Sequence, residues 1–211
     1  HSACWHLGGC IRSRFSVPGY SPLGVATLEG MGDTVSEHLD TRASLRAGRD
    51  VGASHFDRLE PLLARISKPI QYVGGEVNSV VKDWEDATVR WALMYPDAYE
   101  VGAPNQGVQI LYEVLNGRED VLAERTYAVW PDLEELMREH DVPQFTVDGH
   151  RAVGDFDVLG LSFATELGYT NMLNALDLAG VPVHAADRLG DEPLVIAGGH
   201  AAFNPEPIAD F

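Results

Sequence analysis

Three apolar runs of this chain each end in small or polar residues of the kind that bind ligands. The runs are TVRWALMY, DVLGLSF and PLVIAGG, which begin at residues 88, 157 and 193. Glycine lets a ligand approach the backbone closely, and carboxylate and hydroxyl groups fix its orientation. The pattern therefore predicts a ligand site and names no reaction. Its candidate residues are Asp97, Tyr99, Gly102, Ser162, Gly198 and Gly199.

Helical and extended patterns alternate around these runs. We expect strands at 88–95, 121–129, 157–163 and 193–197, separated by helices at about 105–116, 132–140 and 167–179. This alternation predicts an α/β fold with a doubly wound, Rossmann-like or flavodoxin-like parallel sheet. Ligands bind outside the carboxyl ends of such strands, so the candidate residues should lie along one rim. We expect the last strand of the sheet to be missing from this chain.

The chain divides into three parts. Residues 1–30 are rich in glycine and proline without a period, which indicates a disordered or artefactual leader, and both cysteines, Cys4 and Cys10, lie there. Residues 31–87 form a helical and irregular extension. Apolar residues recur at helical spacing between residues 40 and 66, and a glycine turn follows Tyr72. Residues 88–211 form the α/β domain.

The chain has 15 Lys and Arg against 32 Asp and Glu, a net charge of -17. Nucleic acid and anionic membrane are polyanions, so this balance disfavours both as direct partners. The sequence contains neither an apolar stretch long enough to span a membrane nor a secretory signal, and we expect a soluble cytoplasmic protein. We interpret Glu134 as part of a solvated charge run, and His140 and His150 as exposed.

Common catalytic and nucleotide-binding motifs are missing. The sequence contains no GxSxG, GxxxxGK[ST], HExxH or GxGxxG. A flavodoxin-like flavin site would need hydroxyl groups around the phosphate, and residues 96–107 contain no Ser or Thr. No metal site is expected, because the spacing of Cys4 and Cys10 does not match common zinc patterns.

Several strings of the sequence resemble, in order, the N-terminal part of the radical SAM proteins that carry a cobalamin-binding domain. The resemblance covers about residues 60–211. The strings are YVGGEVNSVVKDW at 72–84, YPDAYEVG at 95–102, NGREDVLAER at 116–125, YTNMLN at 169–174 and IAGGHAAFNPEP at 196–207.

The resemblance implies a cobalamin-binding domain followed by a barrel that holds a [4Fe-4S] cluster and cleaves S-adenosylmethionine. That barrel would need a CxxxCxxC motif, and no cysteine follows Cys10. This chain is then a fragment that is not catalytic alone, and its partners are a small-molecule cofactor and the downstream radical SAM domain. By position, DAYEVG at 97–102 corresponds to the family's DxHxxG, Ser162 to its serine, and Gly198 with Gly199 to its glycine pair.

Tyr99 occupies the position of the histidine that would ligate cobalt. A neutral phenol is a poor axial ligand beside imidazole, so cobalamin would bind without histidine ligation. The segment 121–156 also makes the gap between Gly102 and Ser162 wide. Two hypotheses follow: a cobalamin-type cofactor-binding domain of a radical SAM enzyme, or a degenerate, cofactor-free α/β module that docks a partner or the downstream barrel.

Overall fold

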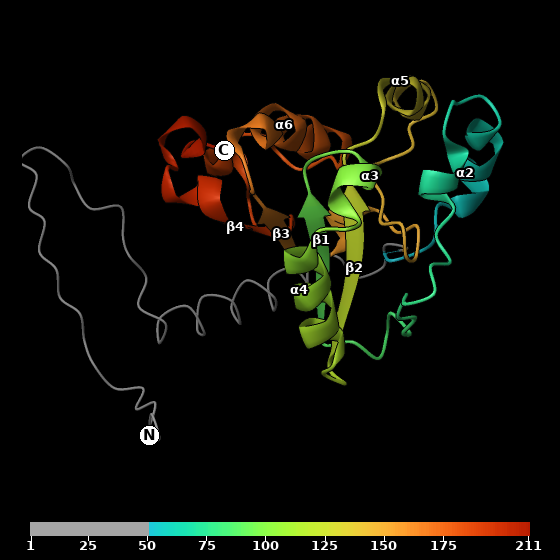
Figure 1. Cartoon of the computed structure of the whole chain (residues 1–211), viewed down its shortest axis with the longest axis horizontal. Helices are drawn as coiled ribbons and strands as arrows, with labels where there is room; N and C mark the ends of the chain where they lie inside the picture. Colours follow the sequence, from blue (N-terminus) through green and yellow to red (C-terminus); the bar gives the residue numbers. More distant parts are fainter. Residues whose placement is uncertain (1–50) are drawn as a thin grey trace, which may run out of the picture.

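The computed structural model describes residues 51–211. The expectations for the leader, for Cys4 and Cys10 and for residues 40–50 lie outside this range. Four strands alternate with helices along the described chain (Figure 1). The strands are β1 (Val89–Tyr95), β2 (Val121–Tyr127), β3 (Val158–Ser162) and β4 (Leu194–Gly198), and the helices are α2 (Phe56–Leu63), α3 (Tyr99–Gly102), α4 (Gln106–Asn116), α5 (Pro131–Glu139) and α6 (Tyr169–Leu178).

All four strands are parallel and their order is β2-β1-β3-β4. The α/β prediction is therefore confirmed, and the predicted strands and the three predicted helices of the domain lie within about two residues of their expected bounds. From β1 the chain passes to β2 on one side and then to β3 on the other. This reversal makes the gap between β1 and β3 the topological switch point of the sheet.

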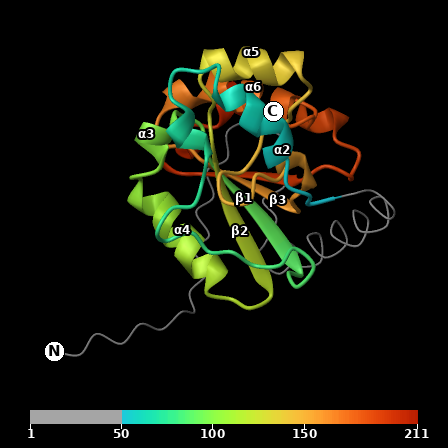
Figure 2. The same ribbon diagram turned by 90° about the vertical axis from the view of Figure 1, so that its right-hand side faces the viewer.

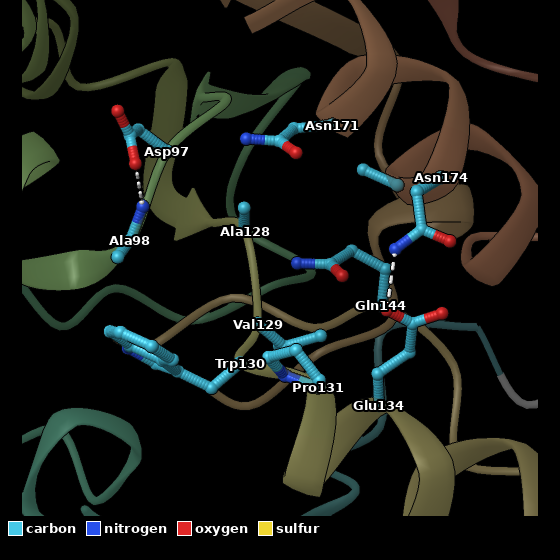
Figure 3. Close-up of a pocket in the computed structure, with 11 residues that line it drawn as sticks. Asp97, Ala98, Ala128, Val129, Trp130, Pro131, Glu134, Gln144, Asn171 and Asn174 are labelled. Atoms are coloured by element: carbon cyan, nitrogen blue, oxygen red, sulfur yellow. Dashed lines mark hydrogen bonds between the residues drawn. The ribbon is translucent and has the colours of Figure 1, made fainter.

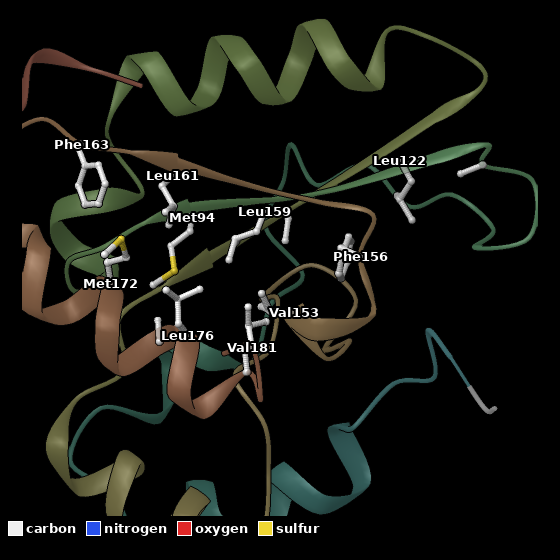
Figure 4. Packing of buried hydrophobic residues seen from close by; sticks show 14 of the residues in the cluster. Met94, Leu122, Val153, Phe156, Leu159, Leu161, Phe163, Met172, Leu176 and Val181 are labelled. Carbon is white, nitrogen blue, oxygen red and sulfur yellow. The ribbon is translucent and has the colours of Figure 1, made fainter. Parts of the chain in front are cut away.

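Helices cover both faces of the sheet. On one face α6 packs Met172 and Leu176 against Met94 and Leu159 of the strands (Figure 4). On the opposite face α4 places its buried residues, Val108 and Tyr112, against the sheet. These inward positions recur at three- to four-residue spacing, as the helix period requires. Burial on two faces explains why the strands read as continuous apolar runs.

The outer edge of β2 is covered by the segment that follows α5. The N–H of Val147 donates to the carbonyl of Arg125, and the hydroxyl of Thr126 donates to the carbonyl of Phe145. As a result all seven residues of β2 are buried, including the charged Glu124 and Arg125. The segment that widens the sequence gap between Gly102 and Ser162 thus includes residues that protect a sheet edge.

The extension before the sheet contributes one helix and an irregular approach. Leu59 and Leu62 of α2 pack against Leu133 and Met137 of α5. Figure 2 shows α2 in front of the other elements, with α5 above it. Within the described residues α2 begins at Phe56, and the N–H of His55 just before it donates to the carbonyl of His150. No helix in the described part of the chain is long and apolar enough to span a membrane.

His150 is buried, and the expectation that it is exposed is wrong. Its ring lies 4.7 Å from that of Phe56 and 6.2 Å from that of Phe145, and its Nε2 lies 2.8 Å from the carbonyl oxygen of Tyr72. Burial lowers the pKa of His150, so the neutral ring is favoured. His140 is exposed, as expected.

Candidate functional site

The ends of β1, β3 and β4 lie next to one another along the carboxyl edge of the sheet. Met94 is in register with Leu161, and Ser162 is in register with Gly198. Asp97 follows three residues after Met94. The structure therefore brings the Asp97 loop, Ser162 and the glycine pair to one edge, where a parallel sheet binds ligands.

Within the glycine pair, Gly199 has a conformation that other residues adopt only with strain. Gly199 has φ 108°, and a Cβ built there would lie 2.2 Å from the carbonyl oxygen of Phe163. Phe163 is held in place by two backbone hydrogen bonds. Its N–H donates to the carbonyl of Gly198, and its carbonyl accepts from the N–H of Ala201. A Cβ on Gly198 would meet no atom within 4 Å. Gly199 is therefore required by the turn, whereas Gly198 leaves open space beside the strand end.

This open space belongs to a shallow hollow of about 330 Å³, which we call the glycine hollow. Its lining is largely apolar, and the side chain of Phe203 is 89% exposed at its margin. Ser162 lies beside the hollow without lining it. The lining residues are Gly198, Gly199, His200, Ala202 and Phe203.

Tyr99 is engaged within the protein. Its hydroxyl donates a 2.5 Å hydrogen bond to Oε1 of Glu76, and its ring meets that of Tyr127 edge to face at 5.3 Å. Burial, together with the bond to Glu76, raises the pKa of Tyr99 to about 12. The phenol is therefore neutral. Gly102 also has a packing role, because a Cβ there would lie 2.5 Å from the ring of Tyr127.

A buried ion cluster holds Glu76 in place. Arg125 bonds to Oδ1 of Asp148 at 2.6 Å and to Oε2 of Glu76 at 2.8 Å. Burial alone would lower the pKa of Arg125, but the hydrogen bonds and charge of Asp148 raise it. The guanidinium stays charged and fully paired, so this cluster fixes the 74–79 segment and the segment after α5 onto β2.

A second hollow of about 260 Å³ opens beside Asp97 (Figure 3). Its walls come from the loop after β1, the connection from β2 to α5, and the first turns of α6. We call it the amide pocket, because three carboxamide side chains line it. The lining residues are Asp97, Ala98, Ala128, Val129, Trp130, Pro131, Glu134, Gln144, Asn171, Asn174 and Ala175.

Sequence reasoning identified only Asp97 in the amide pocket. Glu134, which we expected on a solvated face, is half-buried and accepts a 2.9 Å hydrogen bond from Nδ2 of Asn174. Asn171 and Asn174 are three positions apart on α6, a spacing that places both on one helix face and that could have pointed to the pocket. Gln144 lies outside any regular element and gave no such signal.

Metal ligation is not indicated. Among residues 51–211, no group of three or more His, Cys, Asp or Glu side chains could hold a metal ion. His200 is exposed and lines the glycine hollow.

The chain matches one family model. Residues 107–211, from α4 to the last described residue, match the model described as radical SAM proteins, N-terminal. The comparison supports a radical SAM N-terminal domain over these residues and does not specify cobalamin. Ser162 and the glycine pair lie inside the match, whereas Asp97 and Tyr99 precede it. Searches among curated proteins and among solved structures returned no match.

Proposed function

We propose that the radical SAM N-terminal domain matched at residues 107–211 holds a cobalamin-type cofactor at the carboxyl edge of its sheet. The observation that carries this proposal is the register of Ser162 with Gly198, next to the open space beside the glycine pair. Ligands of parallel sheets bind at this edge, near the point where the strand order reverses.

The glycine hollow suits an extended part of such a ligand. Gly198 exposes backbone without a Cβ in the way, and the exposed ring of Phe203 offers an apolar surface at the margin. Ser162 and Asp97 supply a hydroxyl and a carboxylate from the neighbouring strand ends. These groups would bind and orient the cofactor along the rim.

The structure does not fit ligation of cobalt by the protein at position 99. The Tyr99 hydroxyl donates a hydrogen bond to Glu76, and the Tyr99 ring packs against Tyr127. The phenol remains protonated. Tyr99 would therefore not hold a corrinoid through its metal, and Asp97, Ser162 and the glycine pair would be the residues that bind it. When bound, a corrinoid supplies a cobalt centre for group transfer, and the residues of this chain position it.

The chemistry of the whole protein is proposed to lie in a downstream domain. The chain has two cysteines, which cannot supply the three of a CxxxCxxC motif. The [4Fe-4S] cluster and S-adenosylmethionine would belong to a radical SAM domain outside this chain, and this domain would present its cofactor to it.

Anaerobic reconstitution with hydroxocobalamin tests the proposal. The 211-residue chain is mixed with excess hydroxocobalamin and desalted, and its visible spectrum is recorded. We expect stoichiometric corrin absorbance with the wild type, strong loss with Gly198→Val, which fills the glycine hollow, and full retention with Gly107→Ala, which is exposed on α4. Absence of corrin absorbance in the folded wild type would refute the proposal.

A second candidate is a cofactor-free module that docks another domain. It is favoured by the exposed apolar residues of α4, since Ile110, Leu111 and Val114 are 59%, 48% and 64% exposed on an otherwise amphipathic helix. Neighbouring large apolar side chains on a helix surface indicate an interaction face. A folded wild-type chain that retains no corrinoid would favour this candidate.

A further inference from the structure

Each carboxamide nitrogen of the amide pocket donates at least one hydrogen bond to the protein. Nδ2 of Asn171 donates to the carbonyl of Pro96 at 3.0 Å, and Nδ2 of Asn174 donates to Glu134 at 2.9 Å. Nε2 of Gln144 donates to Thr126 and to the carbonyl of Tyr127 at 2.9 and 2.8 Å. All three carboxamides are therefore oriented with their nitrogens bonded to protein oxygens.

Two oxygens in the pocket wall lack such partners. Asp97 uses Oδ1 to accept from the N–H of Ala98, and within residues 51–211 its second oxygen accepts from no donor. Oδ1 of Asn171 is likewise without a donor in the described chain. Both side chains are partly exposed in the pocket wall, so their free oxygens favour a ligand that donates hydrogen bonds.

The charge of the pocket leads to the same conclusion. Asp97 and Glu134 line it, and no lysine or arginine does. The nearest guanidinium, that of Arg138, is bonded to Glu134, Asp177 and Asn174. Lys68 lies over the ring of Trp130 and is paired with Glu100. An anionic ligand would thus meet carboxylates and no free cation, which excludes phosphates and carboxylates.

We infer that the amide pocket binds a small cationic ligand that carries several N–H donors, an amine or a guanidinium compound. Asp97 supplies the counter-charge, Glu134 adds a second carboxylate, and the carboxamide oxygen of Asn171 accepts from a remaining donor. Figure 3 shows Asn171 and Gln144 approaching Ala128 from separate segments, with Asp97 across the opening. Charge-assisted hydrogen bonds of this kind are the stronger ones.

The size of the pocket limits the ligand. Its volume of about 260 Å³ is just below the range of roughly 300–1,000 Å³ for drug-sized ligands. The pocket lies between the ends of β1 and β2, whereas the glycine hollow lies at the end of β4. The two sites share the carboxyl edge and Asp97, so variants at residues other than Asp97 are needed to distinguish them.

Titration of the full 211-residue chain with methylguanidinium, followed by amide NMR shifts, tests the inference. We expect saturable shifts concentrated at residues 97–98, 128–130 and 171–175, and none of them with acetate at the same ionic strength. Asp97→Asn preserves the bond to Ala98 and removes the charge, so it should weaken binding about tenfold or more. Asp120→Asn, exposed at the opposite edge of the sheet, should leave binding unchanged.

Asn171→Ala separates this inference from the cofactor proposal. It removes an acceptor from the amide pocket and touches neither Ser162 nor the glycine pair. We expect it to weaken methylguanidinium binding and to retain hydroxocobalamin as the wild type does. Shifts spread over the whole acidic surface, equal effects of Asp97→Asn and Asp120→Asn, or equal binding of acetate would each overturn the inference.

Discussion

The hydroxyl of Tyr99 donates to Glu76 at 2.5 Å, and Glu76 is in turn paired with Arg125 at 2.8 Å. Tyr99, at the position where the family resemblance implies a cobalt ligand, is thus the outermost member of a buried ion cluster. Its contacts with Glu76 and Tyr127 give it a structural role that does not depend on any cofactor.

Tyr99→Phe should lower the free energy of unfolding by about 1 kcal/mol, the usual net contribution of one hydrogen bond. Glu76 stays paired with Arg125 in this variant, so the loss should not be larger. Tyr95→Phe is the matched control, because within the described residues the Tyr95 hydroxyl has no partner. Urea denaturation monitored by circular dichroism measures both. Equal losses in the two variants would contradict a specific bond to Glu76.

Gly199→Ala should destabilise the domain by about 3 kcal/mol, since it combines a left-handed φ with a clash. The new Cβ would lie 2.2 Å from the carbonyl oxygen of Phe163, which is held by the backbone of Ala201. Gly198→Ala, one position earlier, should change stability by less than about 1 kcal/mol, because its Cβ meets open space. Thermal and urea unfolding of the pair provide the measurement, and similar stability of both variants would argue against this turn.

The fold followed from the sequence because apolar runs and helical periods alternate in every unit, and tertiary contacts did not override them. The single-turn helix α3 was missed, since one turn gives no period. The burial of β2 was not predictable from VLAERTY, whose Glu124 and Arg125 suggest an exposed strand. Their partners, Arg151 and Asp148, come from a later segment that covers the sheet edge.

Part of the candidate site could be predicted because it depends on local sequence features. Strand ends are local features, so Asp97, Ser162 and the glycine pair could be placed on one edge. The amide pocket combines a loop, a connection and a helix face, and Gln144 joins it only through tertiary structure. His150 was misplaced because its polar neighbours suggested a loop, whereas its ring packs between Phe56 and Phe145.

Stability should fall as the pH is lowered from about 7 towards 5, in part because of His150. Burial lowers its pKa below that of an unfolded histidine, so the unfolded chain binds the proton more readily. The contribution is fully present above the unfolded pKa of about 6.5 and is lost as the pH falls through the folded value.

His150→Asn suits the left-handed backbone at this position, where φ is 55°, and should flatten the dependence of unfolding free energy on pH. His140→Gln alters an exposed histidine and should leave the slope unchanged. Denaturant titrations at several pH values give the slopes, and an NMR titration of the His150 ring gives its pKa directly. A ring that titrates above the unfolded value would show that the sign is wrong.

Asp148→Asn should cost about 3 kcal/mol or more of unfolding free energy, because it leaves Arg125 buried with half of its counter-charge. The two side chains are 2% and 6% exposed, and Asp148 also accepts from the backbone N–H of Arg125 at 2.7 Å. Asp120→Asn breaks an ion pair with Arg118 at the exposed surface, where solvent screens the charges, so it should cost much less than Asp148→Asn. High salt should weaken the surface pair and leave the buried pair nearly unaffected, since ions do not reach it. Urea unfolding at low and high salt separates the two cases. Similar costs for both substitutions would mean that the cluster is open to solvent and does not fix the segment after α5 on the edge of β2.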